Sequence, residues 1–344
     1  MRRRRGGTAM IHGGAPAGWL ELSASLNPLG TPAEVVSAIA AASYGRYADL
    51  DAADAEEHLA REAGVPASCV LLTAGATEAI RLVAEAFARS RRAVVVGPTY
   101  SEYARVGAGV GASVREARAV APSFDPPVGE AIAAAREDAA IVFVCDPNNP
   151  TGRALDAAAI QALASAPGRG SLLVLDASFA AFAEPTYEAR EVIDGGRVVL
   201  VRSLTKRLAT PGVRVGYVVA SPEVVGPLRA ARDPWTVGAH AVAAARAARW
   251  MLSAEERATI ARWRDRLARG LAARGLAPVE SDANFVLAHT AHASALVAEL
   301  GRRRVALRDC SSFGLPDHVR VAVRPPQEQD VLFAAMSEIG AAVA

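Results

Sequence analysis

The chain has 344 residues, of which 51% are apolar, so it is long enough for two domains with a sizeable core and is unlike a disordered protein. Its 38 basic and 36 acidic residues leave a net charge of +2, which creates no overall field for nucleic acid. No apolar run approaches the roughly 20 residues that cross a bilayer, and three cysteines without metal-ligand spacing predict reduced thiols in a cytoplasmic protein.

Residues 1–31 have little periodicity and many small side chains, so we expect an N-terminal arm that lies over the rest of the fold and contributes to the smaller domain and the active site. The strings His12-Gly13-Gly14 and Ser25-Leu26-Asn27-Pro28-Leu29-Gly30 are either plain turns or loops that bring backbone amides to an anion. Helical patterns follow at 32–43 and 53–63, with Tyr44-Gly45-Arg46-Tyr47 between them.

Short β-rich runs then alternate mostly with helical segments. The expected strands are 69–73, 93–96, 113–116, 141–145, 172–175, 198–202 and 214–219. Buried strands separated by helices predict an α/β large domain over residues 32–235, with a seven-stranded and mostly parallel sheet. The links between the last three strands are shorter, so part of this sheet is allowed to be mixed.

The pattern changes near Asp233-Pro234-Trp235. Two helices at about 238–252 and 254–274 suit a bridge between domains. Strands at 284–287, 305–307 and 319–323, with helices near 293–303 and 327–339, then predict a smaller α+β domain over residues 236–344.

Ligands of open α/β sheets bind beyond the carboxyl ends of the strands, so the residues after each expected strand are candidates for a site. Gly75-Ala76-Thr77 leads directly into a helix and forms either a phosphate site or a simple helix cap. Tyr100 offers a ring on which a planar ligand stacks, or packs as an ordinary tyrosine. Asn149 lies in a loop that two prolines and a glycine hold rigidly, as an amide donor requires.

Asp176 follows a strongly apolar strand, where a buried carboxylate needs a cation or a donor. A protonated pyridine nitrogen meets that need, as do a helix cap and an arginine. Lys206 is the single lysine, so the other 37 of the 38 basic residues are arginines. An amine, unlike a guanidinium, can lose its proton and form a Schiff base with a carbonyl. A phosphate cradle, an aromatic ring, an amide donor, an acid and this amine together are what pyridoxal 5′-phosphate requires.

Several strings match one known group of proteins: Gly75-Ala76-Thr77-Glu78-Ala79, Pro98-Thr99-Tyr100, Asn148-Asn149-Pro150-Thr151-Gly152, Ser203-Leu204-Thr205-Lys206 and Gly212-Val213-Arg214-Val215-Gly216-Tyr217. With them the chain resembles the fold-type I pyridoxal-phosphate enzymes of the aminotransferase superfamily over nearly its whole length. The resemblance implies that Lys206 forms the Schiff base and that Asp176 keeps the pyridine nitrogen protonated. It also implies that Asn149 binds the ring hydroxyl and that Tyr100 stacks on the ring.

The resemblance further implies a phosphate site made by Gly75, Ala76, Thr77, Ser203, Thr205 and Arg214. It implies a homodimer with shared sites, in which Tyr47 reaches the phosphate in the neighbouring subunit. The chain departs from its relatives at Asp176-Ala177-Ser178-Phe179, where they usually have Asp-Glu-Ala-Tyr or Asp-Glu-Ala-Phe. Because Phe179 cannot donate to the ring hydroxyl, that contact rests on Asn149.

The two N-terminal strings named above and two C-terminal strings indicate which members of the superfamily the chain resembles most. The C-terminal strings are Leu307-Arg308-Asp309-Cys310-Ser311-Ser312-Phe313-Gly314-Leu315 and His318-Val319-Arg320-Val321-Ala322-Val323-Arg324. They are similar to those of the L-threonine-O-3-phosphate decarboxylases of cobalamin biosynthesis, close kin of histidinol-phosphate aminotransferases. The implied reaction yields (R)-1-aminopropan-2-yl phosphate. The alternative is transamination of histidinol phosphate or a similar amine with 2-oxoglutarate.

The expected substrate is a phosphorylated amino acid, and we expect Asn149 to contact it. We hypothesise that His12, Gly13 and Asn27 hold its phosphate. Arg308 and Arg320 would orient its anionic ends, since arginine forks bind carboxylate and phosphate bidentately. Arg320 matches the carboxylate-binding arginine of the superfamily, and Arg324 is the other candidate for that contact. The alternative interpretation is that Arg308 and Arg320 form surface ion pairs. A cofactor-binding regulator with this fold is a rival from another class, although residues 1–31 are few for a DNA-binding module.

Overall fold

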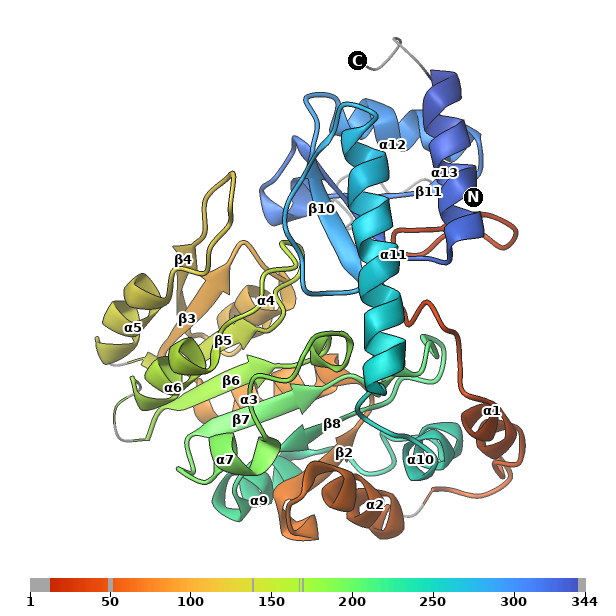
Figure 1. Cartoon of the computed structure of the whole chain (residues 1–344). Helices are drawn as coiled ribbons and strands as arrows, with labels where there is room; N and C mark the ends of the chain where they lie inside the picture. Colours follow the sequence, from red (N-terminus) through yellow and green to blue (C-terminus); the bar gives the residue numbers. More distant parts are fainter. Residues whose placement is uncertain (1–12, 49–51, 138, 167, 169, 340–344) are drawn as a thin grey trace, which may run out of the picture.

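A computed structural model describes residues 13–48, 52–137, 139–166, 168 and 170–339. Its main feature is a seven-stranded sheet, which lies in the lower half of Figure 1 below a smaller sheet. The strands follow one another across the large sheet in the order β2 (Val70–Thr73), β8 (Gly216–Val219), β7 (Val198–Arg202), β6 (Leu172–Asp176), β5 (Ala139–Cys145), β3 (Arg92–Gly97) and β4 (Ser113–Arg118).

The strands of this sheet are parallel except for β8, which runs antiparallel to β2 and β7. Most are uninterrupted buried runs of valine, leucine, isoleucine and alanine, as expected for a sheet that is covered on both faces. The predicted α/β fold with a mostly parallel sheet is therefore confirmed. The last strand begins at Gly216 instead of residue 214, because Arg214 has a left-handed φ of 57°.

Helices pack on both faces of the large sheet. One face carries α3 (Ala76–Phe87), α4 (Glu102–Gly109) and α9 (Pro222–Ala231). The other carries α2 (Ala53–Ala63), α5 (Val128–Arg136), α6 (Ala157–Ser165), α7 (Ala189–Ile193) and α10 (Ala239–Arg246), with α1 (Ala33–Ala40) beside α10. Within the described part of the chain, no helix has the length and apolar character needed to span a membrane.

The helix α11 (Ala254–Ala272) runs from the large sheet to the smaller one (Figure 1). It begins with a capping box, in which Ser253 Oγ accepts from Glu256 N and the Glu256 carboxylate accepts from Ser253 N. The sequence suggests two bridging helices, but α10 ends at Arg246 and packs against α1 and α2. Among the helices of the described residues, α11 alone makes this connection.

The smaller sheet is antiparallel, with the order β12 (Arg308–Asp309), β13 (His318–Ala322), β10 (Phe285–His289) and β9 (Ala277–Pro278). The helices α12 (Ala293–Arg302) and α13 (Pro326–Ile339) complete this region. A separate parallel pair joins β1 (Leu20–Glu21) of the arm to β11 (Val305–Ala306).

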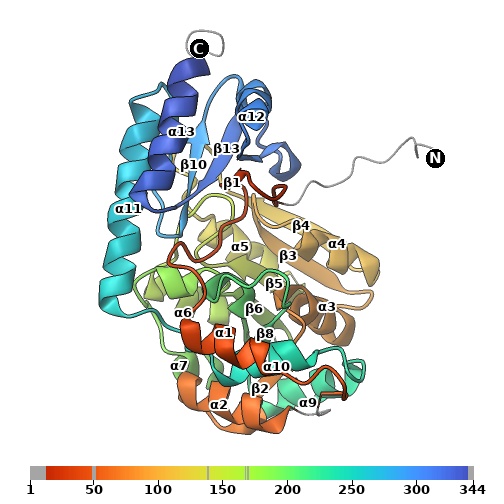
Figure 2. The same ribbon diagram turned by 90° about the vertical axis from the view of Figure 1, so that its right-hand side faces the viewer.

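The arm connects the two sheets. It leaves β1 beside the smaller sheet and descends to α1 beside the large one (Figure 2). On the way, Asn27 N donates to Lys206 O at 3.0 Å and Asn27 Nδ2 donates to Arg207 O at 3.0 Å. The arm is thus tied to the segment that follows β7, where the single lysine lies.

Gly216 permits the close contact of β8, β7 and the first turn of α3. A Cβ at this position would lie 2.9 Å from Ala76 N, Arg202 O and Gly75 C, which are backbone atoms. We expect Gly216→Ala to lower the free energy of unfolding by about 1–3 kcal/mol through overpacking. Gly129→Ala in α5, where nothing lies within 4 Å of the added Cβ, should instead raise it by up to about 1 kcal/mol. Urea unfolding compares the two, and equal effects would contradict this description.

Candidate active site

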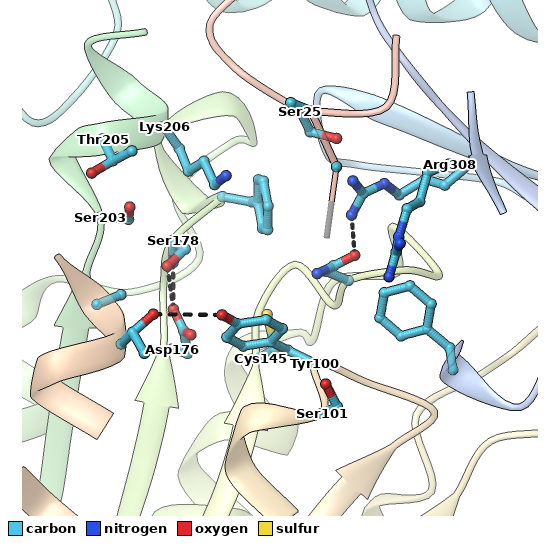
Figure 3. Close-up of a pocket in the computed structure, with 18 of the residues that line it drawn as sticks. Ser25, Tyr100, Ser101, Cys145, Asp176, Ser178, Ser203, Thr205, Lys206 and Arg308 are labelled. Carbon is cyan, nitrogen blue, oxygen red and sulfur yellow. Dashed lines mark hydrogen bonds between the residues drawn. The ribbon is translucent and has the colours of Figure 1, made fainter. Parts of the chain in front are cut away.

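The carboxyl ends of the parallel strands, the arm and the smaller sheet surround a cavity of about 210 Å³. Figure 3 shows Lys206 and Asp176 on one side of it and Arg308 on the opposite side. The predicted cofactor residues that line the cavity are Ala76, Thr77, Tyr100, Asn149, Asp176, Ser203, Thr205, Lys206 and Arg214. They meet because parallel strands bring their carboxyl ends to one edge of the sheet, and because the antiparallel β8 starts at that same edge, just after Arg214.

Lys206 lies in the short helix α8 (Leu204–Arg207), directly after β7. The backbone around it is fixed by two bonds from Thr205 to Val215 O, from Thr205 N at 3.0 Å and from Oγ1 at 3.1 Å. Burial lowers the pKa of Lys206 to about 8, and the positive charges of Arg320 and Arg214 act in the same direction. Asp176 opposes this shift. The amine is therefore partly neutral near physiological pH, as a nucleophile must be.

Asp176 ends β6 with only 3% of its surface exposed. Its Oδ2 accepts a hydrogen bond from Tyr103 Oη at 2.7 Å. Its Oδ1 accepts two bonds from Ser178, from the amide at 2.9 Å and from the hydroxyl at 2.5 Å, and the second is drawn in Figure 3. Burial raises the pKa of Asp176, whereas the bonds from Ser178 and Tyr103 and the charge of Lys206 lower it.

An anion site forms where α3 begins. Gly75 takes the N-cap position without a capping side chain, so the first amides of the helix stay available to a ligand. A Cβ on Gly75 would lie 2.9 Å from Arg214 Nη2, so glycine leaves room for this guanidinium. Ser203 and Thr77 add hydroxyls to the same wall. These residues fit a phosphate ester.

Arg308 and Arg320 lie directly opposite each other on β12 and β13 and both line the cavity. Arg320 donates to Asn149 Oδ1 and to Ser23 O, and Arg308 donates to Ser312 Oγ at 2.7 Å. Burial lowers the pKa of both guanidinium groups, that of Arg320 to about 10. Among the residues that the structure describes, no carboxylate forms an ion pair with either of them.

Arg324, the other candidate for the carboxylate contact, is bonded to Glu328 at 2.9 Å and is not among the cavity residues. Gly13 does line the cavity. Asn27 does not, because its side chain holds the arm by donating to Arg207 O and accepting from Leu29 N. His12 lies outside the described residues, so its role stays a prediction.

Tyr47 lies away from the cavity of its own subunit. Its side chain is 81% exposed, and its ring packs against Trp235 with 5.0 Å between the ring centroids. Phe179 lines the cavity and packs edge-on against Phe285, so it brings an apolar ring where a tyrosine would bring a hydroxyl.

Sequence reasoning did not assign roles to Ser25, Tyr103, Ser178 and Phe313, which also line the cavity. Ser25 is 1% exposed, and its hydroxyl has no hydrogen-bond partner within the described ranges. Tyr103 lies in the first turn of α4, three residues after Tyr100. Ser178 was visible only as a departure from the pattern of relatives.

Known proteins share this fold and much of the sequence. The family described as aminotransferase class I and II matches residues 17–336. The histidinol-phosphate aminotransferase of Symbiobacterium thermophilum is 38% identical over 331 residues, covering 93% of this chain and 91% of that protein. The threonine-phosphate decarboxylase of Salmonella typhimurium is 32% identical over 343 residues, covering 96% and 94%. The crystal structure of histidinol-phosphate aminotransferase from Sinorhizobium meliloti in complex with pyridoxal-5′-phosphate has a TM-score of 0.86 at 25% identity, covering 94% of this chain and 91% of that one.

The cavity fits the cofactor of these relatives. It has an amine with a lowered pKa, a buried carboxylate and an open helix end beside Arg214, which suit the aldehyde, ring nitrogen and phosphate of pyridoxal 5′-phosphate. The chain therefore belongs to the class I and II aminotransferase family and is a pyridoxal-phosphate-dependent enzyme.

Proposed function

We propose that this enzyme decarboxylates L-threonine O-3-phosphate to (R)-1-aminopropan-2-yl phosphate, the linker of the nucleotide loop of cobalamin. The observation that carries the proposal is the pair Arg308 and Arg320, two buried cations that face one cavity without a carboxylate partner in the described chain. An amino acid that bears both a carboxylate and a phosphate gives each guanidinium an anion. The name of the Salmonella typhimurium relative supports this substrate.

The chemistry divides between the cofactor and the protein. When bound, pyridoxal 5′-phosphate supplies an electron sink for the bond that breaks at Cα. Asp176 would hold the ring nitrogen, and the backbone amides at the start of α3 would hold the phosphate. Lys206, whose pKa is lowered to about 8, would supply the neutral amine that binds the cofactor and would be placed to return a proton to Cα.

Orientation of the substrate decides which bond breaks. Decarboxylation would require a substrate orientation in which the bond from Cα to the carboxylate breaks, whereas transamination would require one in which the bond from Cα to hydrogen breaks. Arg320 is held between Asn149 Oδ1 and Ser23 O, so its guanidinium has a fixed direction. We propose that Arg308 and Arg320 hold the carboxylate and the phosphate of the substrate. These two contacts would set the rotation about the bond between Cα and the amino nitrogen.

The second candidate is an aminotransferase that acts on histidinol phosphate with 2-oxoglutarate. The 38% identity to the Symbiobacterium thermophilum enzyme favours it. Histidinol phosphate brings one anionic group and leaves one of the two arginines unpaired, although 2-oxoglutarate brings two carboxylates. The cofactor residues serve both reactions equally, so the substrate side of the cavity must decide.

We also propose a homodimer in which Tyr47 completes the cofactor site of the partner subunit. Tyr44 and Tyr47 are 87% and 81% exposed, and Trp235 beside them is 55% exposed. Such a cluster of exposed aromatic rings is typical of a protein interface. Since Tyr47 does not line the cavity of its own subunit, its hydroxyl is available to a second copy.

Incubation with L-threonine O-3-phosphate tests the reaction. We expect release of CO₂ and formation of aminopropanol phosphate without any 2-oxo acid, because the proton returns to Cα. Both products are measured in the presence and absence of 2-oxoglutarate. Strict dependence on 2-oxoglutarate would establish the aminotransferase instead. So would turnover of histidinol phosphate in enzyme that does not turn over threonine phosphate.

The pH dependence of cofactor uptake tests Lys206. Only the neutral amine attacks the aldehyde, so the rate at which apoenzyme gains the absorbance band of bound cofactor should rise about tenfold per pH unit and level off above pH about 8. Stopped-flow absorbance measures this rate. Lys206→Arg keeps the positive charge and should give no such band. A flat rate between roughly pH 6 and 9, or a band in this variant, would contradict the assignment.

A pair of arginine variants tests the substrate side. Arg308→Gln should raise KM for threonine phosphate about 10- to 100-fold, since it removes a charged hydrogen-bonding partner of the substrate, while leaving the cofactor band in place. Arg324→Gln is the matched control, because Arg324 bonds to Glu328 outside the cavity. Steady-state kinetics of both variants give the comparison. Similar KM values for Arg308→Gln and Arg324→Gln would remove Arg308 from the substrate site.

A further inference from the structure

The surroundings of Asp176 supply an unusually complete set of hydrogen-bond donors. Ser178 donates twice to Oδ1, and Tyr103 donates once to Oδ2. A carboxylate has about four acceptor positions, two on each oxygen. Three are occupied, so one position on Oδ2 remains for a further donor. The ring nitrogen of the cofactor, which we propose Asp176 holds, would occupy that position.

Asp176 needs these donors because its side chain is buried, with 3% of its surface exposed. The groups that face it are Tyr103 from α4, Cys145 from the neighbouring strand β5 and Lys206 from α8. Burial raises the pKa of Tyr103 and of Cys145 well above their usual values, so both stay uncharged and Tyr103 keeps its proton for donation. The amide and hydroxyl of Ser178 and the hydroxyl of Tyr103 stabilise the ionised form of Asp176.

Packing fixes both donors in place. The Tyr103 ring stacks on Phe143 with 5.4 Å between centroids and meets the edge of Tyr100 at 5.7 Å. Ser178 is buried and donates to Oδ1 with its backbone amide as well as its hydroxyl, which orients the side chain.

We propose that the hydroxyls of Ser178 and Tyr103 are positioning groups that keep Asp176 ionised and aim Oδ2 at the ring nitrogen, so that this nitrogen stays protonated in the bound cofactor. The inference rests on the cofactor alone and holds for decarboxylation and transamination alike. Failure of the proposed substrate would leave it intact.

The test is nitrogen-15 NMR of holoenzyme reconstituted with cofactor labelled at the ring nitrogen. The wild type should give the chemical shift of a protonated pyridine nitrogen. Ser178→Ala removes the hydroxyl but keeps the amide donor, and should move the signal toward the neutral value and weaken cofactor binding about tenfold. Ser178→Thr retains a hydroxyl and should restore both quantities.

Tyr103→Phe is the second variant, and it should shift the signal in the same direction even if Ser178→Ala does not fold. Its matched control is Tyr217→Phe, which removes the hydroxyl of another fully buried tyrosine, one bonded to Arg202 outside the cavity. A wild-type chemical shift and affinity in either Ser178→Ala or Tyr103→Phe would overturn the inference. So would a neutral nitrogen in the wild type, or an equal change in Tyr217→Phe.

Discussion

The burial of opposite charges at one edge of the sheet is the constraint on which the site depends. Asp176 ends β6 and Lys206 follows the adjacent parallel strand β7, so their side chains reach one cavity. Desolvation opposes both charges, lowering the pKa of the amine and raising that of the carboxyl. Hydrogen bonds from Ser178 and Tyr103 lower the pKa of the carboxyl, while the charges of Arg320 and Arg214 add to the effect of burial in lowering the pKa of the amine. The sheet thus prepares a nucleophile and an acceptor for a ring nitrogen.

The same edge also determines how the two sheets are joined. The arm pairs with β11 through β1, supplies Ser23 O to Arg320 and then bonds to the backbone of Lys206 and Arg207. Arg320 in turn donates to Asn149 in the loop after β5. Arg320, which we propose binds the substrate, is therefore connected to the Asn149 loop and to the arm. A change in the arm should alter substrate orientation without removing any catalytic group.

Much of this architecture could be predicted from the sequence, because strand ends are local features. Each expected strand of the large sheet is present, and most of the residues chosen after those strands line the cavity. The direction of β8 could not be predicted, because short links allow an antiparallel strand but do not require one. Tyr103 and Ser178 were missed because their role is a bond across elements to Asp176, which spacing does not encode. Asn27 was expected to face the substrate, yet its amide is used by the backbone of Arg207.

The central claim is that Lys206 carries the cofactor, and the composition of the chain makes it directly measurable. Borohydride reduction of the holoenzyme fixes a Schiff base as a stable secondary amine, and peptide mass spectrometry then locates it. With one lysine in 344 residues, we predict one pyridoxyl-phosphate group per chain, on the peptide that contains Lys206. An unmodified Lys206 peptide from enzyme that had bound its full complement of cofactor would contradict the account.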